Sequence, residues 1–187
     1  MKLPKYQSTF FLGAVEELID DRVDLHFSRT KFVDDCSGYF LEDPLSLKVA
    51  IWKNNWFSVF LHEYNHYKQW KKQTEAWVNA KDTDFLNTFK KEDRLKTQLV
   101  EQECDIASYM TIKTYNLEGM ENYVREANAY HVSYKNMEEH KSWFKKGRLP
   151  YHIDEVSELC PNDRFFTRKE LDNPDPRLYD AISKHCF

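Results

Sequence analysis

The chain has 187 residues, a net charge of −4 at pH 7 and a hydrophobic fraction of 41%. This length suits one domain with a sizeable core, so we expect a single domain over residues 1–187. The near-balanced charge argues against the basic surface of a nucleic-acid-binding protein. The chain has only four Gly residues and contains no Gly-rich phosphate-binding loop.

The N-terminal residues do not lead into a continuous apolar stretch, because acidic residues follow soon after Phe10-Phe11-Leu12. We therefore expect no signal peptide and no membrane partner. The four Cys residues are widely spaced and form no CxxC pair. Reduced thiols and a cytoplasmic location are the expectation that follows.

The first element expected is a helix over residues 8–24, where Phe11, Val15 and Leu18 recur at helical spacing. Two strands are predicted next, over residues 37–41 and 47–52, with a turn at residues 42–44 between them. The second strand alternates apolar residues with small or polar ones, as half-buried strands do. These segments predict a small, mostly antiparallel sheet.

A helix is predicted over residues 56–72, with Asn54 or Asn55 as its N-cap. Short helical pieces are expected within residues 74–94, and a further helix over residues 95–115. A long helix is predicted over residues 120–146, ending at Gly147, and a tail of short helices and loops follows over residues 151–187. The fold class expected is therefore α+β, with the sheet and the site helices in residues 1–116 and a helical extension and tail over residues 117–187.

The motif with the clearest chemical meaning is His-Glu-Tyr-Asn-His at residues 62–66, an HExxH pattern. Residues four apart on an α-helix differ by only ~40° around its axis, so His62 and His66 face one side and can share a metal. Zn²⁺ suits two imidazole nitrogens and one carboxylate, with a fourth position for water. We predict that Glu63 acts as general base on that water and returns the proton to the leaving amine. The alternative is a solvated helix face on which the pattern occurs by chance.

A third metal ligand is predicted on the helix over residues 95–115. Gln69 and Lys72 stand where a metzincin would have Gly and a third His, which excludes that family. Glu101 and Asp105 share one helix face, whereas Glu103 is rotated by ~200° from Glu101. We predict that Glu101 binds the metal and that Asp105 accepts the second ring N–H of a ligand His. The alternative is an acidic, solvated helix face.

Residues 62–66 followed by Glu101-x-x-x-Asp105 resemble the gluzincin group of zinc metallopeptidases, and the Glu-x-Glu-x-Asp-x-x-Ala form is similar to that of its small intracellular or phage-like members. The resemblance covers residues 47–108. It implies a zincin-like fold, a Zn²⁺ cofactor and hydrolysis of peptide bonds in a peptide or protein substrate. It also implies that residues 47–52 form the edge strand along which an extended peptide lies.

Three further residues have weaker claims to a role. Enzymes of this group commonly use a His or Tyr to stabilise the oxyanion, and His131 and Tyr134 are the candidates, with packing as the alternative role. Cys104 flanks Glu101 without sharing its face, and we expect a buried, unreactive thiol.

Three functions are compatible with these patterns. The leading hypothesis is a zinc metallopeptidase. The second is a zinc-binding regulatory or sensor protein that keeps the zincin fold without proteolysis. The third is a metal-free helical interaction protein in which the HExxH pattern has no chemical role.

Overall fold

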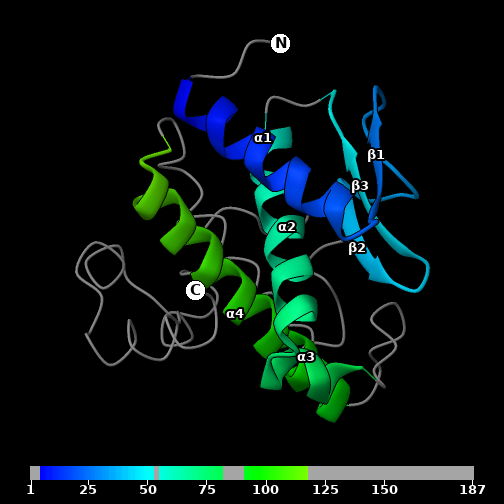
Figure 1. The fold of residues 1–187 in the computed structure, drawn as a ribbon. Helices are drawn as coiled ribbons and strands as arrows, with labels where there is room; N and C mark the ends of the chain where they lie inside the picture. The colour runs from blue at the N-terminus through cyan, green and yellow to red at the C-terminus, as the bar shows by residue number, and fades with distance from the viewer. Residues whose placement is uncertain (1–4, 53–54, 82–90, 118–187) are drawn as a thin grey trace, which may run out of the picture.

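The computed structural model describes residues 5–52, 55–81 and 91–117 (Figure 1). The elements follow one another in the order α1 (Lys5–Asp20), β1 (Asp24–Ser28), β2 (Gly38–Glu42), β3 (Leu45–Ala50), α2 (Trp56–Lys72), α3 (Glu75–Ala80) and α4 (Lys91–Tyr115). The predicted α+β class is confirmed. The helix predicted over residues 120–146 and the tail after it lie outside the described residues.

The sheet has three strands in the order β1-β3-β2. Strand β3 pairs in parallel with β1 and antiparallel with β2, so that Leu47 lies between Leu25 and Phe40. The sheet is thus mixed, where a mostly antiparallel one was predicted. The prediction that residues 47–52 form an edge strand was wrong, because β3 takes the centre and β2 lies at an edge. Both faces of β3 contain buried residues, as a central strand requires.

The predicted helix over residues 8–24 is shorter at its C-terminus, because α1 ends at Asp20 and β1 begins at Asp24. Arg22 has a φ of 61°, and its N–H donates to the Ile19 carbonyl, which closes the helix end. Val23 is buried and continues the apolar pattern across this turn. The spacing of apolar residues therefore concealed the boundary, and β1 was missed.

The helix that carries the HExxH pattern has the predicted bounds, Trp56–Lys72. Asn55 stands at the N-cap position, but its side chain makes no capping hydrogen bond. Thr74 caps α3, since its side chain accepts from the Trp77 N–H. Helix α4 begins at Lys91, before the predicted residue 95, and ends at Tyr115 as predicted.

The two sides of α2 contact different kinds of surface. One side packs on β2 and β3, and the other contacts α4, while α1 crosses the molecule beside α2 (Figure 1). The sheet side is largely apolar: Phe60 is fully buried in one cluster with Leu18 of α1 and Leu47 and Val49 of β3. The side toward α4 is polar. Buried polar side chains at this contact come from α2 (Asn65, His66 and Gln69) and from α4 (Glu101, Asp105 and Ser108).

Gly38 brings β2 unusually close to α2. A Cβ at this position would lie 2.5 Å from Val59 Cγ1, 3.0 Å from the Lys48 backbone oxygen and 3.4 Å from Glu63 Cγ. Only a residue without a side chain fits this contact without displacing its neighbours. None of the helices in the described ranges has the length and apolarity needed to cross a membrane.

Candidate metal centre

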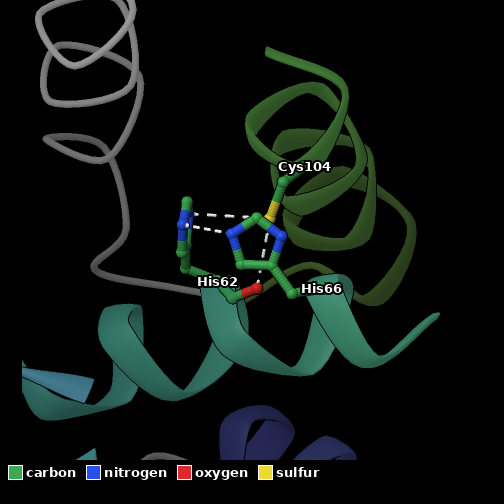
Figure 2. Close-up of side chains that lie close together, drawn as sticks. All are labelled: His62, His66 and Cys104. Carbon is green, nitrogen blue, oxygen red and sulfur yellow. Dashed lines mark hydrogen bonds between the residues drawn. The ribbon is translucent and has the colours of Figure 1, made fainter. Parts of the chain in front are cut away.

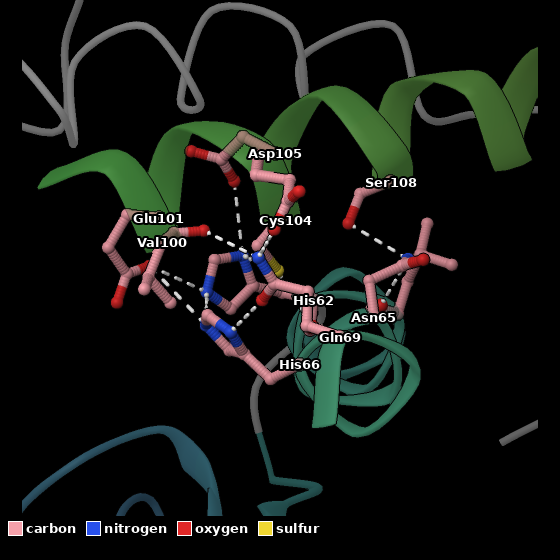
Figure 3. Close-up of polar contacts among 11 residues, drawn as sticks. His62, Asn65, His66, Gln69, Val100, Glu101, Cys104, Asp105 and Ser108 are labelled. Carbon is pink, nitrogen blue, oxygen red and sulfur yellow. Dashed lines mark hydrogen bonds and ion pairs between the residues drawn. The ribbon is translucent and has the colours of Figure 1, made fainter. Parts of the chain in front are cut away.

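The predicted site residues come from facing sides of two helices. His62 and His66 project from α2, one helical turn apart, and Glu101 and Asp105 project from α4, also one turn apart (Figure 3). All four lie at the contact between these helices. Glu101 and Asp105 are buried, so the alternative of a solvated acidic face does not describe them.

Three possible ligand atoms converge at this contact. His62 Nε2 lies 3.0 Å from His66 Nε2, and Glu101 Oε2 lies 3.1 Å from the first nitrogen and 3.4 Å from the second. A tetrahedral Zn²⁺ with ligands at about 2.0–2.1 Å separates its ligand atoms by about 3.3 Å. The three distances therefore match one face of a zinc tetrahedron.

The opposite nitrogen of each imidazole faces a hydrogen-bond acceptor. His62 Nδ1 lies 3.0 Å from Asp105 Oδ1, and His66 Nδ1 lies 2.7 Å from Gln69 Oε1. An acceptor at Nδ1 assigns the proton to that nitrogen and directs the Nε2 lone pair toward the other ligand atoms. Asp105 occupies the position predicted for it, whereas the contact of Gln69 was not predicted.

Cys104 lies beside the two imidazoles (Figure 2). Its Sγ and one nitrogen each of His62 and His66 lie within 4.8 Å of one another, so these three residues could also hold a metal ion. The thiol donates to the His62 carbonyl at 3.2 Å, and Sγ lies 3.7 Å from His62 Nδ1. Cys104 is fully buried, as predicted, and its thiol approaches the imidazole of His62.

Buried charges face one another in this centre. Burial raises the pKa of Glu101, but the adjacent His66 and His62 lower it more, so the carboxyl pKa lies well below its usual range. For His66, burial lowers the pKa, while Cys104 and Glu101 raise it, and the net pKa is raised. Protonated His66 thus holds positive charge close to Glu101, as a cation at the same place would.

Glu63 is buried between the centre and the sheet. Its pKa is affected by the charges of His62, His66 and Glu101 and by the Phe40 backbone of β2. Burial raises the pKa of Glu63, and the two imidazoles offset part of this rise. Its side chain thus lies beside the candidate ligand residues and has a raised pKa.

Glu103 does not join the ligand atoms, in line with its predicted rotation on the helix. Its Oε2 accepts from Gln69 Nε2 and from Thr74 Oγ1, both at 2.6 Å. Gln69 Nε2 also donates to the Val100 carbonyl at 3.0 Å. Glu103 is therefore linked to His66 through Gln69.

The remaining predicted residues, His131 and Tyr134, lie outside the described part of the chain. Sequence reasoning missed the contacts of Gln69 and Cys104. For Gln69 a signal was present, since it lies three positions after His66 and hence on the same face of α2. For Cys104 the sequence placed the residue on α4 but not the approach of its thiol to α2.

A scan against protein-family models and searches of curated proteins and of solved structures found no match to this chain.

Proposed function

We propose that the protein is a zinc-dependent peptidase of the gluzincin type, with a zincin-like fold. His62, His66 and Glu101 hold Zn²⁺, Glu63 is the general base, and Asp105 orients His62. The observation that carries the proposal is the triangle of ligand atoms with sides of 3.0, 3.1 and 3.4 Å. Three such atoms leave one tetrahedral position for water or substrate, as catalytic zinc sites do.

The protein residues around the centre fit this reaction. Zinc, when bound, acidifies a water molecule and polarises the substrate carbonyl. Glu63 would take a proton from the attacking water as the water oxygen bonds to the carbonyl carbon, and would give that proton to the amine nitrogen as the C–N bond breaks. Its raised pKa suits both steps, because a base with a pKa closer to neutral returns the proton more readily.

The sheet edge offers a place for an extended peptide. Strand β2 is at the edge of the described sheet, and the Phe40 backbone of β2 contacts Glu63. We propose that the substrate backbone pairs with β2 in the manner of an added strand. A peptide in this position has its scissile bond close to the catalytic residues.

The first test is the metal content of the purified full chain, determined by elemental mass spectrometry. We expect about one zinc per chain, lost in Glu101→Ala and kept in the control Glu16→Ala, which removes an exposed carboxylate of α1. Glu63→Gln should keep zinc and lose hydrolysis of a peptide library by at least about 100-fold. A chain without zinc after reconstitution, or full hydrolysis by Glu63→Gln, would contradict the proposal.

The position of Cys104 favours one second candidate, a zinc-binding regulatory protein without proteolysis. A thiolate ligand added to His62, His66 and Glu101 would close the tetrahedron, and closed sites are structural rather than catalytic. Cobalt substitution distinguishes the two candidates, because thiolate ligation gives Co²⁺ an intense near-ultraviolet absorption. That band, lost in Cys104→Ser, would favour the regulatory protein; its absence in the wild type would favour the peptidase.

A further inference from the structure

The side chain of Gln69 has a fixed orientation at the metal centre. It is 1% exposed, and its amide nitrogen faces two acceptors, the Val100 carbonyl at 3.0 Å and Glu103 Oε2 at 2.6 Å. The amide oxygen must therefore face His66 Nδ1, which lies 2.7 Å away. An oxygen can only accept, so Gln69 assigns the proton of His66 to Nδ1 and the lone pair to Nε2.

The same hydrogen bonds continue beyond Gln69 to a third helix. Glu103 Oε2 also accepts from the hydroxyl of Thr74 at 2.6 Å, and Thr74 Oγ1 in turn accepts from the Trp77 N–H at 3.4 Å. Thr74 is buried and is the N-cap of α3. A continuous series of contacts thus runs from His66 on α2, through Glu103 on α4, to the start of α3.

The two imidazoles are oriented in different ways. His62 meets a carboxylate directly at Nδ1, through Asp105. His66 meets a neutral amide, and the carboxylate stands one residue further away, at Glu103. This arrangement orients the ring without placing another negative charge in contact with it.

We propose that Gln69, Glu103 and Thr74 form a positioning relay that fixes the tautomer of His66 and thereby strengthens metal binding. The inference rests on the proposed zinc site. Residues that orient a metal-binding imidazole typically change metal affinity by about 10- to 100-fold when they are removed. Gln69 acts through His66 and does not touch the metal or the substrate.

The test is the zinc affinity of the full chain, measured by competition with a chromophoric chelator. Gln69→Met keeps the approximate size of the side chain and removes the acceptor, so we expect zinc affinity to fall about 10- to 100-fold. The matched control is Asn65→Leu. Asn65 is also a buried amide on α2 that bridges to α4, but its Nδ2 donates to the Leu61 carbonyl at 2.9 Å and to Ser108 Oγ at 3.0 Å rather than serving Nδ1 of His66. We expect both variants to lower the melting temperature and only Gln69→Met to weaken zinc binding.

A rescue experiment separates positioning from packing. Gln69→Glu sets two carboxylates against each other and should weaken zinc binding. Combining it with Glu103→Gln restores the donor–acceptor pair between positions 69 and 103, in which the new carboxylate accepts from both His66 and the new amide. The Val100 carbonyl loses its donor in both the single and the double variant, so the comparison between these two isolates the pair. We expect this double variant to recover zinc affinity to within a few-fold of the wild type, and the comparison still decides if Gln69→Met does not fold.

Each contrary result has a distinct meaning. Unchanged zinc affinity in Gln69→Met, with zinc lost in Glu101→Ala, would overturn the relay and leave the proposed function standing. Equal losses of affinity in Gln69→Met and Asn65→Leu, without recovery in the double variant, would also overturn it. A wild-type chain that binds no zinc would overturn the proposed function and the relay together.

Discussion

Despite its burial, the imidazole of His66, one of the proposed ligands, has a pKa raised by its neighbours Cys104 and Glu101. Its Nε2 lies near two other acceptor atoms, His62 Nε2 at 3.0 Å and Glu101 Oε2 at 3.4 Å. Three lone pairs at these distances repel one another unless a proton or a metal ion lies among them. The raised pKa of His66 favours a proton among these atoms when no metal is bound, and in the proposed zinc site the metal ion takes the place of the proton.

This competition predicts a pH dependence of zinc binding. Because the pKa of His66 is raised in the metal-free fold, its proton stabilises that fold below the unfolded pKa of about 6.5, and this contribution is lost as pH rises through the folded pKa. Zinc must displace the proton, so its stabilising effect increases with pH. We expect the melting-temperature difference between zinc-loaded and chelator-treated protein to widen between about pH 6 and pH 8. A difference that does not change with pH would contradict this assignment.

At the scale of single residues, the sequence predicted the helix face on which a side chain lies but not its contacts with the neighbouring helix. The angle between successive residues on a helix was sufficient to place Glu101 and Asp105 on one face and Glu103 on another. The contact of Gln69 with Glu103 joins residues 34 positions apart and depends on how α2 and α4 dock. No local pattern contains that information, and the same holds for the thiol of Cys104.

At the scale of elements, the contact between β2 and α2 at Gly38 is the most sensitive to a small change. Gly38→Ala would place a methyl group 2.5 Å from Val59 Cγ1 and 3.0 Å from the backbone of the central strand. We expect it to lower the free energy of unfolding by about 1–3 kcal/mol and to reduce the proposed peptide hydrolysis, since Glu63 must shift with α2. Denaturant unfolding and peptidase assays measure the two effects.

Gly13 provides the control for this substitution. It lies within α1, and a Cβ there would meet nothing within 4 Å. Gly13→Ala should therefore stabilise the protein by about 0.5–1 kcal/mol, because alanine favours the helix. Equal effects of the two substitutions would show that the close approach at Gly38 has no energetic importance.

The elements also differ in how well the sequence predicted them. Helix α2 was predicted with its observed bounds, because turn residues precede it and its apolar spacing is regular. Strand β1 was missed because its five residues, Asp24–Ser28, are partly polar and nowhere fully buried. The strand order depends on the pairing of β1 with β3, which are neighbours in the sheet although β2 lies between them in the sequence. Such a non-local pairing leaves no local sequence pattern.

At the scale of the whole molecule, an ionic cluster fastens α1 to α2. Glu17 of α1 accepts from Lys68 at 2.8 Å, from Lys71 at 3.0 Å and from the hydroxyl of Tyr64. Burial raises the pKa of Glu17, but these three residues lower it more, to about 2. The cluster thus stabilises the ionised carboxylate in the folded state.

The cluster predicts acid sensitivity. A carboxyl with a depressed folded pKa stabilises the fold above its unfolded pKa, and this contribution is lost as pH falls from about 4.5 toward 2. Glu17→Gln should cost about 1–2 kcal/mol of unfolding free energy at pH 7, a value reduced by solvent screening, and the cost should diminish over that pH range. The exposed neighbour Glu16 provides the control, and Glu16→Gln should change stability little at either pH. A cost for Glu17→Gln that persists at pH 2 would contradict the role of its charge.

The contrast between the two sides of α2 has a consequence for local opening. The apolar side holds α2 to the sheet whether or not an ion is present. On the other side, a proton on His66 or a bound metal ion offsets the desolvation of the buried carboxylates, and a metal ion would offset it more strongly. The contact of His62 with Asp105 joins positions 43 residues apart, so a bound ion would tether two distant parts of the chain. Amide hydrogen exchange should therefore accelerate first in α4 when zinc is chelated, while β3 retains its protection. The contact between α2 and α4 would therefore open well before the sheet unfolds.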